Sequence, residues 1–572
     1  IIEQSSIIIA KNSGDARTLR YTGLDEDIQG TAMALDRSRD RGYVGLRATS
    51  ALAMALFEQS GLRGLLDERI PVDKRRKLSI GYAVKAFIGD MMGHADRRAL
   101  SRVSDPFMSA PVSEMFGEKM DLEGLGATAL SRDLDIMFEA DLPAVTYDCY
   151  RLLASRYGLD SNIFNIDSTN FGISAKEKTA DIEGAAVPEW CGHPKDSKAR
   201  IVYSLLSVTD ENSIVCYERP YDGATADSEM DRGAIEFLSG KVDPSSTTLV
   251  ADCKIATAPL VGLMTSEGFG FVAKCPENFG RKVRDDIVYS VSTGTMDPSS
   301  VRDGWEIYDT DAEVDGGMLR FVAYRTSDDI QAGIEYHREQ DLKEAQALLG
   351  RFSSRLFNCE EDARRAITEA LGNLSDSAYE VGWSVSEVES RSYGHRGRPR
   401  KDEKPTVRTE YRVDVSLEFD EERAKELSKD RSVRVLVTNL PRANGDAENI
   451  RFGATADTVL LTYLGQYHVE HAFRLMKDGM SMKKVYIQKP SRENAMMFVI
   501  SIATMLTDLA DHVLKREGVD TTFSDFVRRS VSLILARDPV SGDEHFMGPS
   551  ILADEFMDVS EALGIDTDRL MC

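Results

Sequence analysis

The chain has 572 residues, a length typical of roughly three or four domains. Hydrophobic residues make up 42% and charged residues 29%, which allows a large core and excludes wholesale disorder. The length excludes a small disulfide-stapled scaffold, and the seven cysteines are dispersed with no C-x-x-C pair, which favours a reducing, cytoplasmic location. The net charge of −25 argues against a nucleic-acid partner, although clustered basic residues can override a bulk charge.

No membrane role is predicted. The longest apolar stretch, 496–506, is shorter than the roughly 20 residues that a membrane-spanning helix needs. Residues 1–11 lack the basic segment and the small-residue cleavage site of a signal peptide.

Residues 38–157 are expected to be mostly helical. Apolar residues recur at three- and four-residue spacing over 52–65 and 78–92. Two basic clusters fall in this part of the chain, at 74–77 and around Arg97, Arg98 and Arg102. They are either solvated helix faces or phosphate contacts of a helical module, and spacing does not separate the two interpretations.

From residue 162 the hydrophobic pattern becomes typical of strands. Residues 162–167 and 247–252 are short apolar runs that each end in an acid. Residues 200–206 and 213–218 alternate around turn residues at 210–212, which predicts a pair of strands. Helices near 234–238 and from about 256, and a strand at 269–273, complete the pattern of a mixed sheet with helices packed on it.

Residues 276–430 are predicted to form a separate block. It contains a strand at 317–324, a helical stretch at 342–374, a basic loop and an alternating strand at 411–419. A strand at 433–438 and two long helices, about 456–477 and 491–515, follow. The last 50 or so residues have a mixed pattern, and no function is predicted for them.

The basic loop indicates nucleic-acid contact. Residues 391–408 hold seven Lys or Arg and two acids, a local net charge of +5. The segment 396–399, Arg-Gly-Arg-Pro, is similar to the core of AT-hook segments, which insert Arg into narrow minor grooves. A solvated linker is the alternative interpretation.

Three acids are candidates for chemistry. Asp167 and Asp252 are each expected to close a strand at the rim of the sheet. Neighbouring carboxylates repel unless cations lie between them, and Mg²⁺ prefers such oxygen ligands. A third carboxylate, Glu470 from a helix across the rim, would complete a two-metal site for phosphodiester chemistry. As single residues, the two Asp could equally be turn or capping residues.

The helix that carries Glu470 has a polar stripe. Tyr463, Glu470 and Lys477 are spaced by seven, which brings them to one helix face, and Gln466 lies on the same face. A solvated face is the alternative. The neighbouring histidines fit neither H-E-x-x-H nor H-x-x-E-H, which argues against a zinc protease, and the chain has no phosphate-binding G-x-x-x-x-G-K-[ST] loop.

The stripe resembles a known signature. Tyr463-x2-Gln466-x3-Glu470-x6-Lys477 is similar to the Y-x2-R-x3-E-x6-K motif of DDE insertion-sequence transposases with a β-rich insertion domain. Residues 167–171 resemble the family's D-[ST]-T-x-F, 192–196 its G-Y-S-K-D, 223–227 its G-N-x-x-D and 396–399 its R-G-R-P. The resemblance covers roughly residues 38–517. Gln466 departs from the family's Arg, and Asn165 departs from a His common in this branch.

The resemblance implies an α/β fold: a ribonuclease-H-like mixed-sheet catalytic core, interrupted by a β-rich insertion domain and preceded by a helical domain. The implied domains, in chain order, are a helical DNA-end-binding domain (1–157), the first part of the core (158–275), the insertion domain with the basic loop (276–430), the second part of the core with the Glu helix (431–517) and a carboxy-terminal tail (518–572).

The resemblance further implies a DNA transposase that cuts insertion-sequence ends and joins them to target DNA. Asp167, Asp252 and Glu470 would be the catalytic residues and would hold two Mg²⁺ ions, for which Mn²⁺ can substitute. The implied DNA-binding residues are Tyr463, Gln466, Lys477, Arg396, Arg398 and Arg400.

The implied partners are double-stranded DNA, at the transposon ends and the target, and a second copy of the chain in the synaptic complex. The expected location is the cytoplasm, at the nucleoid, with no membrane partner. Two alternatives stay open: a transposase-derived DNA-binding protein without catalytic activity, and a structure-specific nuclease that shares the core but lacks strand transfer.

Overall fold

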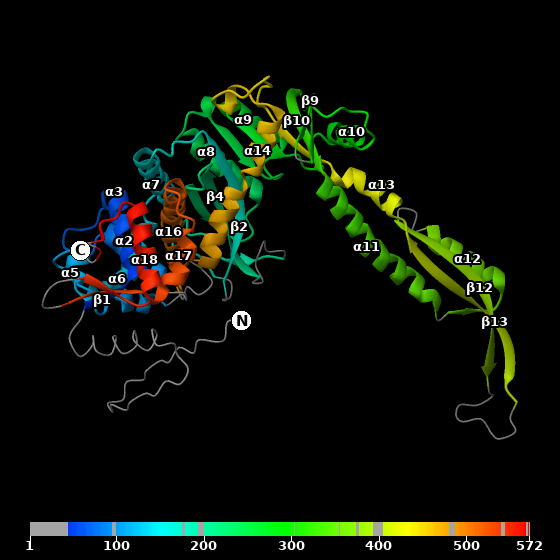
Figure 1. Cartoon of the computed structure of the whole chain (residues 1–572), viewed down its shortest axis with the longest axis horizontal. Coiled ribbons are helices and arrows are strands. Elements are labelled where there is room, and N and C mark those ends of the chain that lie inside the picture. The colour runs from blue at the N-terminus through cyan, green and yellow to red at the C-terminus, as the bar shows by residue number, and fades with distance from the viewer. Residues whose placement is uncertain are drawn as a thin grey trace.

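The structure is a computed structural model with a body of helices and a large sheet, from which a long arm projects (Figure 1). It describes residues 44–93, 99–173, 178–192, 200–302, 304–353, 355–372, 377–392, 404–479, 487–538, 544–567 and 570.

The amino-terminal part is helical, as predicted. Its first two helices are separated by Gly61, whose φ of +85° is the left-handed conformation that favours glycine at a helix end. Its helices are α2 (Ala48–Ser60), α3 (Leu62–Arg69), α4 (Ile80–Gly93), α5 (Val112–Phe116), α6 (Ala127–Phe138) and α7 (Leu142–Tyr157).

The last 50 residues complete this helical body. Strand β1 (Val44–Arg47) pairs antiparallel with β15 (Ile534–Arg537), and β15 pairs with β16 (Glu544–Met547). The two ends of the described chain therefore lie together, as the blue and red ribbons of Figure 1 show. Helices α17 (Phe523–Arg529) and α18 (Ser550–Ala562) belong to the same part of the chain.

A ten-stranded mixed sheet forms the centre of the molecule. Its order is β3-β4-β2-β6-β7-β14-β10-β9-β8, with β5 also paired to β4. Among the described strand pairs of this sheet, β2–β6 and β6–β7 are parallel and the others antiparallel. The predicted strands of the first half are confirmed as β2 (Ile163–Gly172), β4 (Ile201–Asp210), β5 (Val215–Tyr221), β6 (Thr248–Ala251) and β7 (Gly270–Lys274), with β3 (Glu189–Trp190) at the edge.

The sheet continues beyond residue 276, where a separate block was expected to begin. Four later strands join it through the antiparallel pairing of β14 with β7 and with β10. They are β8 (Ser300–Arg302), β9 (Trp305–Val314), β10 (Gly317–Thr326) and β14 (Arg434–Thr438).

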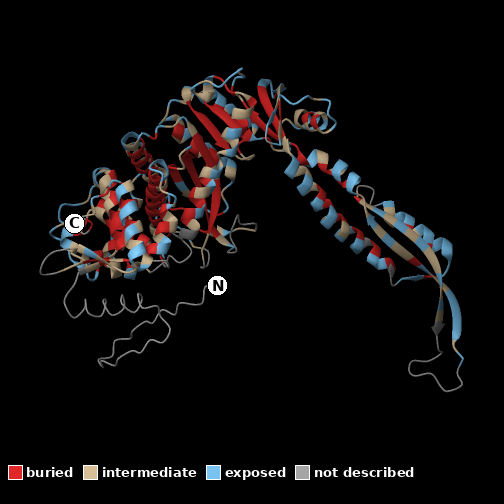
Figure 2. Cartoon of the chain, viewed as in Figure 1, coloured by how far each residue is buried: buried red, intermediate tan, exposed pale blue. Residues whose placement is uncertain are grey.

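Helices cover both faces of the sheet. On one face lie α7, α8 (Asp227–Ser239) and α9 (Ala258–Glu267), because Tyr150 of α7 packs on Phe164 of β2 and Phe237 of α8 on Tyr217 of β5. On the other face Glu493 of α16 (Pro490–Arg516) accepts a hydrogen bond of 2.5 Å from the Tyr203 hydroxyl. Figure 2 shows the buried residues concentrated in this layered body.

The arm is an excursion between β10 and β14. Its helices α11 (Ser327–Ser353) and α13 (Glu421–Ser432) pack side by side, and its outer part joins α12 (Glu360–Leu371) to a hairpin of β12 (Tyr379–Ser392) and β13 (Thr406–Phe419). The predicted helical stretch 342–374 is wrong as one element, since the short strand β11 (Leu356–Phe357) divides it and pairs with β13. The arm is largely exposed (Figure 2).

Helix α16 is the predicted helix 491–515. By length and composition it could cross a membrane, but 89% of its most apolar 18-residue segment is buried inside the protein. It packs against α6, α7 and β5, which is the environment of a core helix. Helix α10 (Arg281–Ser292) completes the body beside β9 and β14.

The predicted continuous helix 456–477 is wrong. The segment divides into α14 (Ala456–Leu464), α15 (Tyr467–Arg474) and a π-helical turn, η7 (Leu475–Gly479). At the break, the Gln466 amide donates to the Tyr463 carbonyl at 3.0 Å and the His468 amide to the Gly465 carbonyl at 3.1 Å. These three-residue bonds tighten the chain at Gly465, a residue of low helix propensity.

Candidate active site

Asp167 and Asp252 lie on neighbouring parallel strands. Ile166 of β2 pairs with Ala251 of β6, so each acid lies one residue beyond the same pair. Residues in register on adjacent strands project from the same face, with backbones about 4.8 Å apart. The structure therefore brings these two predicted site residues together.

The prediction that Asp167 ends its strand is wrong. β2 runs on to Gly172, and Asp167 pairs with Ser207 of β4 in the middle of the strand. The reason is that Ser168 to Phe171 are residues able to pair and pack, and all four find partners on β4. Asp252 directly follows the last residue of β6, as predicted.

Both acids face the helices that carry the polar stripe. The Lys477 amine, in η7, donates a hydrogen bond to the hydroxyl of Thr169, which lies two residues beyond Asp167 on the same face. Burial raises the pKa of the half-buried Tyr463 of α14, and the charge of Asp252 adds to this effect. Lys477 and Tyr463 thus lie near Asp167 and Asp252 respectively.

Glu470 lies in the first turn of α15, which packs on β2 and β4. Its side chain is exposed and forms no ion pair with any part of the chain that the structure describes. Within the described ranges, no three or more His, Cys, Asp or Glu are grouped closely enough to hold a metal ion. The three acids supply the oxygen donors that Mg²⁺ prefers. Asp167 and Asp252 share a face of the sheet, but Glu470 is not grouped with them.

The remaining predicted DNA-binding residues are placed unevenly. Gln466 lies half-buried at the break between α14 and α15, where its side chain makes no capping hydrogen bond. Arg396, Arg398 and Arg400 lie outside the described residues.

The basic cluster at 74–77 is a loop between α3 and α4, not a helix face. Three of its cations meet acids: Arg75 pairs with Asp73, Arg76 with Asp133 and Lys77 with Asp121. These ion pairs reduce the charge that the loop can offer to phosphate.

Asp227 is a positioning residue to which the sequence assigned no role. It begins α8, on the opposite face of the sheet, and accepts a hydrogen bond of 2.6 Å from Ser168. It also pairs at 2.5 Å with Lys254, two residues after Asp252. Asp227 therefore links the strand of Asp167 to the loop that follows Asp252, and its place at the end of the Gly-Ala-Thr-Ala-Asp segment was the available signal.

A buried acid lies behind the Glu470 helix. Asp508 of α16 is fully enclosed, and its Oδ1 lies 3.6 Å from His471 Nε2. Burial raises the pKa of Asp508 well above its usual range, with the charges of Asp511 and Asp210 adding to it, and burial lowers the pKa of His471. Both shifts favour the neutral form of the group concerned.

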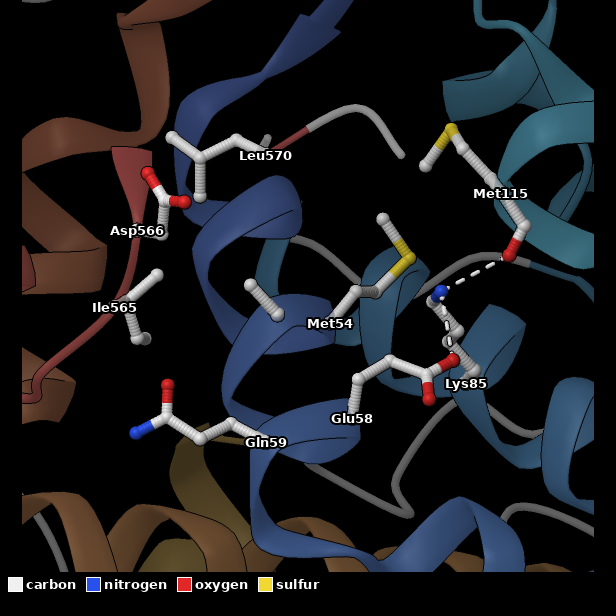
Figure 3. A pocket seen from close by; sticks show the side chains of 9 residues that line it. Met54, Glu58, Gln59, Lys85, Met115, Ile565, Asp566 and Leu570 are labelled. Carbon is white, nitrogen blue, oxygen red and sulfur yellow. Dashed lines mark hydrogen bonds and ion pairs between the residues drawn. The ribbon is translucent and has the colours of Figure 1, made fainter. Parts of the chain in front are cut away.

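A cavity of about 190 Å³ lies where the carboxy-terminal segment covers α2 and α4 (Figure 3). In its wall Lys85, only 3% exposed, donates to Glu58 Oε1 at 3.0 Å and to the Met115 carbonyl at 2.9 Å. Asp566 and Leu570 line the opposite side. The charge of Lys85 is therefore paired inside the protein, beside a cavity that the carboxy-terminal segment lines.

Comparison with protein families matches residues 49–148 to a domain of unknown function, DUF4277. The match covers the helices from α2 to the first half of α7, which is less than half of the chain. A comparison with curated proteins finds no match.

Proposed function

We propose that this protein is a DNA transposase that cuts the ends of an insertion sequence and joins them to target DNA. The observation that carries the proposal is the register of Asp167 and Asp252, two acids on one face of adjacent parallel strands, with the helix of Glu470 packed across that face. The proposed location is the cytoplasm, at the nucleoid.

The strand arrangement supports a ribonuclease-H-like core. β2, β4 and β5 form an antiparallel meander, and β6 and β7 continue the sheet in parallel on the other side of β2. The arm leaves the sheet after β10 and returns at β14, before the Glu470 helix. This is the position at which the resemblance implies an insertion.

The residues of the site suit phosphodiester chemistry. Two Mg²⁺ ions held by Asp167, Asp252 and Glu470 would stabilise the attacking and leaving oxygens of an in-line displacement. Because phosphoryl transfer relies on positioning and charge stabilisation, the protein needs no nucleophile of its own. Lys477, held beside Thr169, offers a cation to the DNA backbone next to Asp167, and Tyr463 borders Asp252.

The arm would add a second DNA contact. Its hairpin ends at Ser392 and Thr406, and the basic residues Arg396, Arg398 and Arg400 lie in the intervening sequence. Replacement of Arg396 and Arg398 by Ala is expected to lower DNA affinity on all sequences, because phosphate contacts are not sequence-specific. Unchanged affinity would reduce this segment to a linker.

The test is a cleavage assay on DNA that carries the ends of the element flanking the gene, with and without Mg²⁺. We expect metal-dependent nicking at the end by the wild type and none by Glu470→Gln, which keeps the size of the side chain but removes its charge. Joining of a pre-cleaved end to target DNA then separates a transposase from a structure-specific nuclease. Nicking by Glu470→Gln at the wild-type rate would contradict the assigned site.

The exposed, unclosed position of Glu470 favours one second candidate, a DNA-binding protein without catalytic activity. Gln466, in place of the family's Arg, points the same way. Specific end binding without nicking in any divalent metal would support this candidate. Recovery of nicking by Gln466→Arg would instead identify a weakened transposase.

A further inference from the structure

A row of polar side chains extends from Asp167 to a buried glutamate. Asp167 of β2 pairs with Ser207 of β4, and Ser207 pairs with Glu218 of β5. Residues directly opposite one another on antiparallel strands project from the same face, so the three side chains lie on the face that carries Asp252. Glu218 is two strands from Asp167, a backbone separation of about 10 Å.

The two members of this row beyond Asp167 are buried without full hydrogen bonding. Ser207 is 0% exposed and Glu218 is 5% exposed. Within the described residues, Ser207 Oγ and Glu218 Oε2 have no hydrogen-bond partner, nor does Thr504 Oγ1 on α16, the helix that packs on β5. Buried polar atoms without partners are costly, and ordered water is the usual way in which such atoms are satisfied.

A cavity lies beside Glu218, at the end of the row away from Asp167. It has a volume of about 360 Å³ and lies between the α6–α7 junction, the end of β5 and the first turns of α16. Glu218 is one of its lining residues. The polar row therefore has the acid face of the candidate active site at one end and this cavity at the other.

Glu218 forms no ion pair with any residue that the structure describes. Its neighbours are Ser207 and, from α16, Ser501, which forms a hydrogen bond with it. The nearest charged residues of α16 on either side, Glu493 and Asp508, lie about two helical turns away in sequence. The cavity is lined by three further charged residues, Asp141, Glu183 and Arg219, and the guanidinium of Arg219 lies over the Tyr221 ring.

We propose that Glu218 accepts the proton of the attacking water, through Ser207 and ordered water, and releases it to solvent through the cavity. In this step an O–H bond of the water breaks and its proton passes to Ser207 Oγ. The hydroxyl proton of Ser207 passes on to the Glu218 carboxylate, which becomes a carboxylic acid. The resulting hydroxide attacks the phosphorus, the P–O bond to the 3′ oxygen breaks, and this leaving oxygen takes up a proton from solvent, while Glu218 returns its own proton to bulk water. The inference rests on the proposed function.

The acidity of Glu218 agrees with this role. Burial raises the pKa of Glu218 to about 8, with the Ser501 hydrogen bond opposing the shift. An acceptor is most effective when its pKa is close to the working pH, and contributions of about 10²-fold are typical of such groups. The rate should therefore rise with pH up to about 8 and then level off.

The test compares wild type, Glu218→Gln and Ser207→Ala, with Glu493→Gln as a buried glutamate outside the row. We expect Glu218→Gln to nick DNA about 10²-fold more slowly at pH 8 and to lose the inflection in its pH–rate profile. Ser207→Ala should be slowed but keep the inflection, and Glu493→Gln should keep the wild-type profile. Thermal melting of each variant identifies any loss of rate that comes from misfolding.

A second measurement does not depend on activity. Subtracting the infrared spectrum of Glu218→Gln from that of the wild type cancels the other buried acids, and the difference should contain a protonated-carboxyl band that disappears as the pH rises through about 8. A wild-type pH–rate profile in Glu218→Gln, or absence of this band, would overturn the inference alone. Absence of nicking by the wild type would instead overturn the proposed function on which it rests.

Discussion

Asp167 and Asp252 each lie one residue beyond the Ile166–Ala251 pair on two parallel strands. Asp167 and Asp252, 85 positions apart on the chain, are thus held on one face of the sheet, separated by a single strand spacing. Two carboxylates at this distance repel each other, and a bound cation removes the repulsion. This relationship is the structural reason for treating them as a pair of metal ligands.

Replacement of Asp167 by Ala is expected to reduce metal-dependent nicking by about 10³-fold or more while end binding persists, because phosphoryl transfer relies on charge stabilisation. Cleavage and gel-shift assays on the same end fragment measure the two properties. Asp297→Ala, which removes an exposed acid in the loop after α10, is the control and should behave as wild type. Retained cleavage in Asp167→Ala would remove Asp167 from the site.

Replacement of Lys477 by Ala is expected to weaken end binding and to lower the slope of log affinity against log salt by about 1, the value for one lost phosphate contact. Titrations of labelled end DNA at several salt concentrations measure the slope. Thr169→Val is the matched control, since it removes the hydroxyl partner of Lys477 but keeps the cation. An equal loss of slope in both variants would contradict a direct phosphate contact.

Replacement of Asp227 by Asn is expected to lower the free energy of unfolding by about 1–2 kcal/mol, because Asp227 joins Ser168 and Lys254 through charge-assisted bonds. Nicking should fall further than stability explains, since the same bonds hold the segments of Asp167 and Asp252. Urea denaturation and cleavage assays measure both quantities. Glu229→Gln changes an exposed charge in the same helical turn and should leave both unchanged.

Stability is expected to fall more steeply in the wild type than in Asp508→Asn as the pH rises above about 4, the usual pKa of an aspartate. Burial raises the pKa of Asp508 in the folded protein, so the folded state keeps a proton that the unfolded state has released. Folding then takes up a proton in this range, and raising the pH opposes it.

Urea denaturation at several pH values measures the difference. Asp520→Asn, which removes an exposed acid after α16, should keep the wild-type pH dependence. Parallel curves for wild type and Asp508→Asn would mean that Asp508 keeps an ordinary pKa in the folded protein.

Local pattern predicted much of the core but not its details. Alternation and apolar runs located β2, β4, β5, β6 and β7, and the apolar content located α16. The same reasoning ended β2 at Asp167, because an acid after an apolar run looks like a strand end. It also missed the break at Gly465, since a spacing of seven describes residue types and is insensitive to a local change of helix geometry.

The amino-acid sequence by itself determined most core strands, helix α16 and which carboxylates follow apolar runs, because these properties depend on neighbours a few residues away. Only the tertiary structure decided that β6 lies beside β2, that Asp227 links the segments of both acids, and that β15 completes the amino-terminal body through β1. Strand pairing likewise places Ser207 and Glu218 in the row of polar side chains that begins at Asp167. These relationships rest on pairing between distant segments, which no local periodicity encodes.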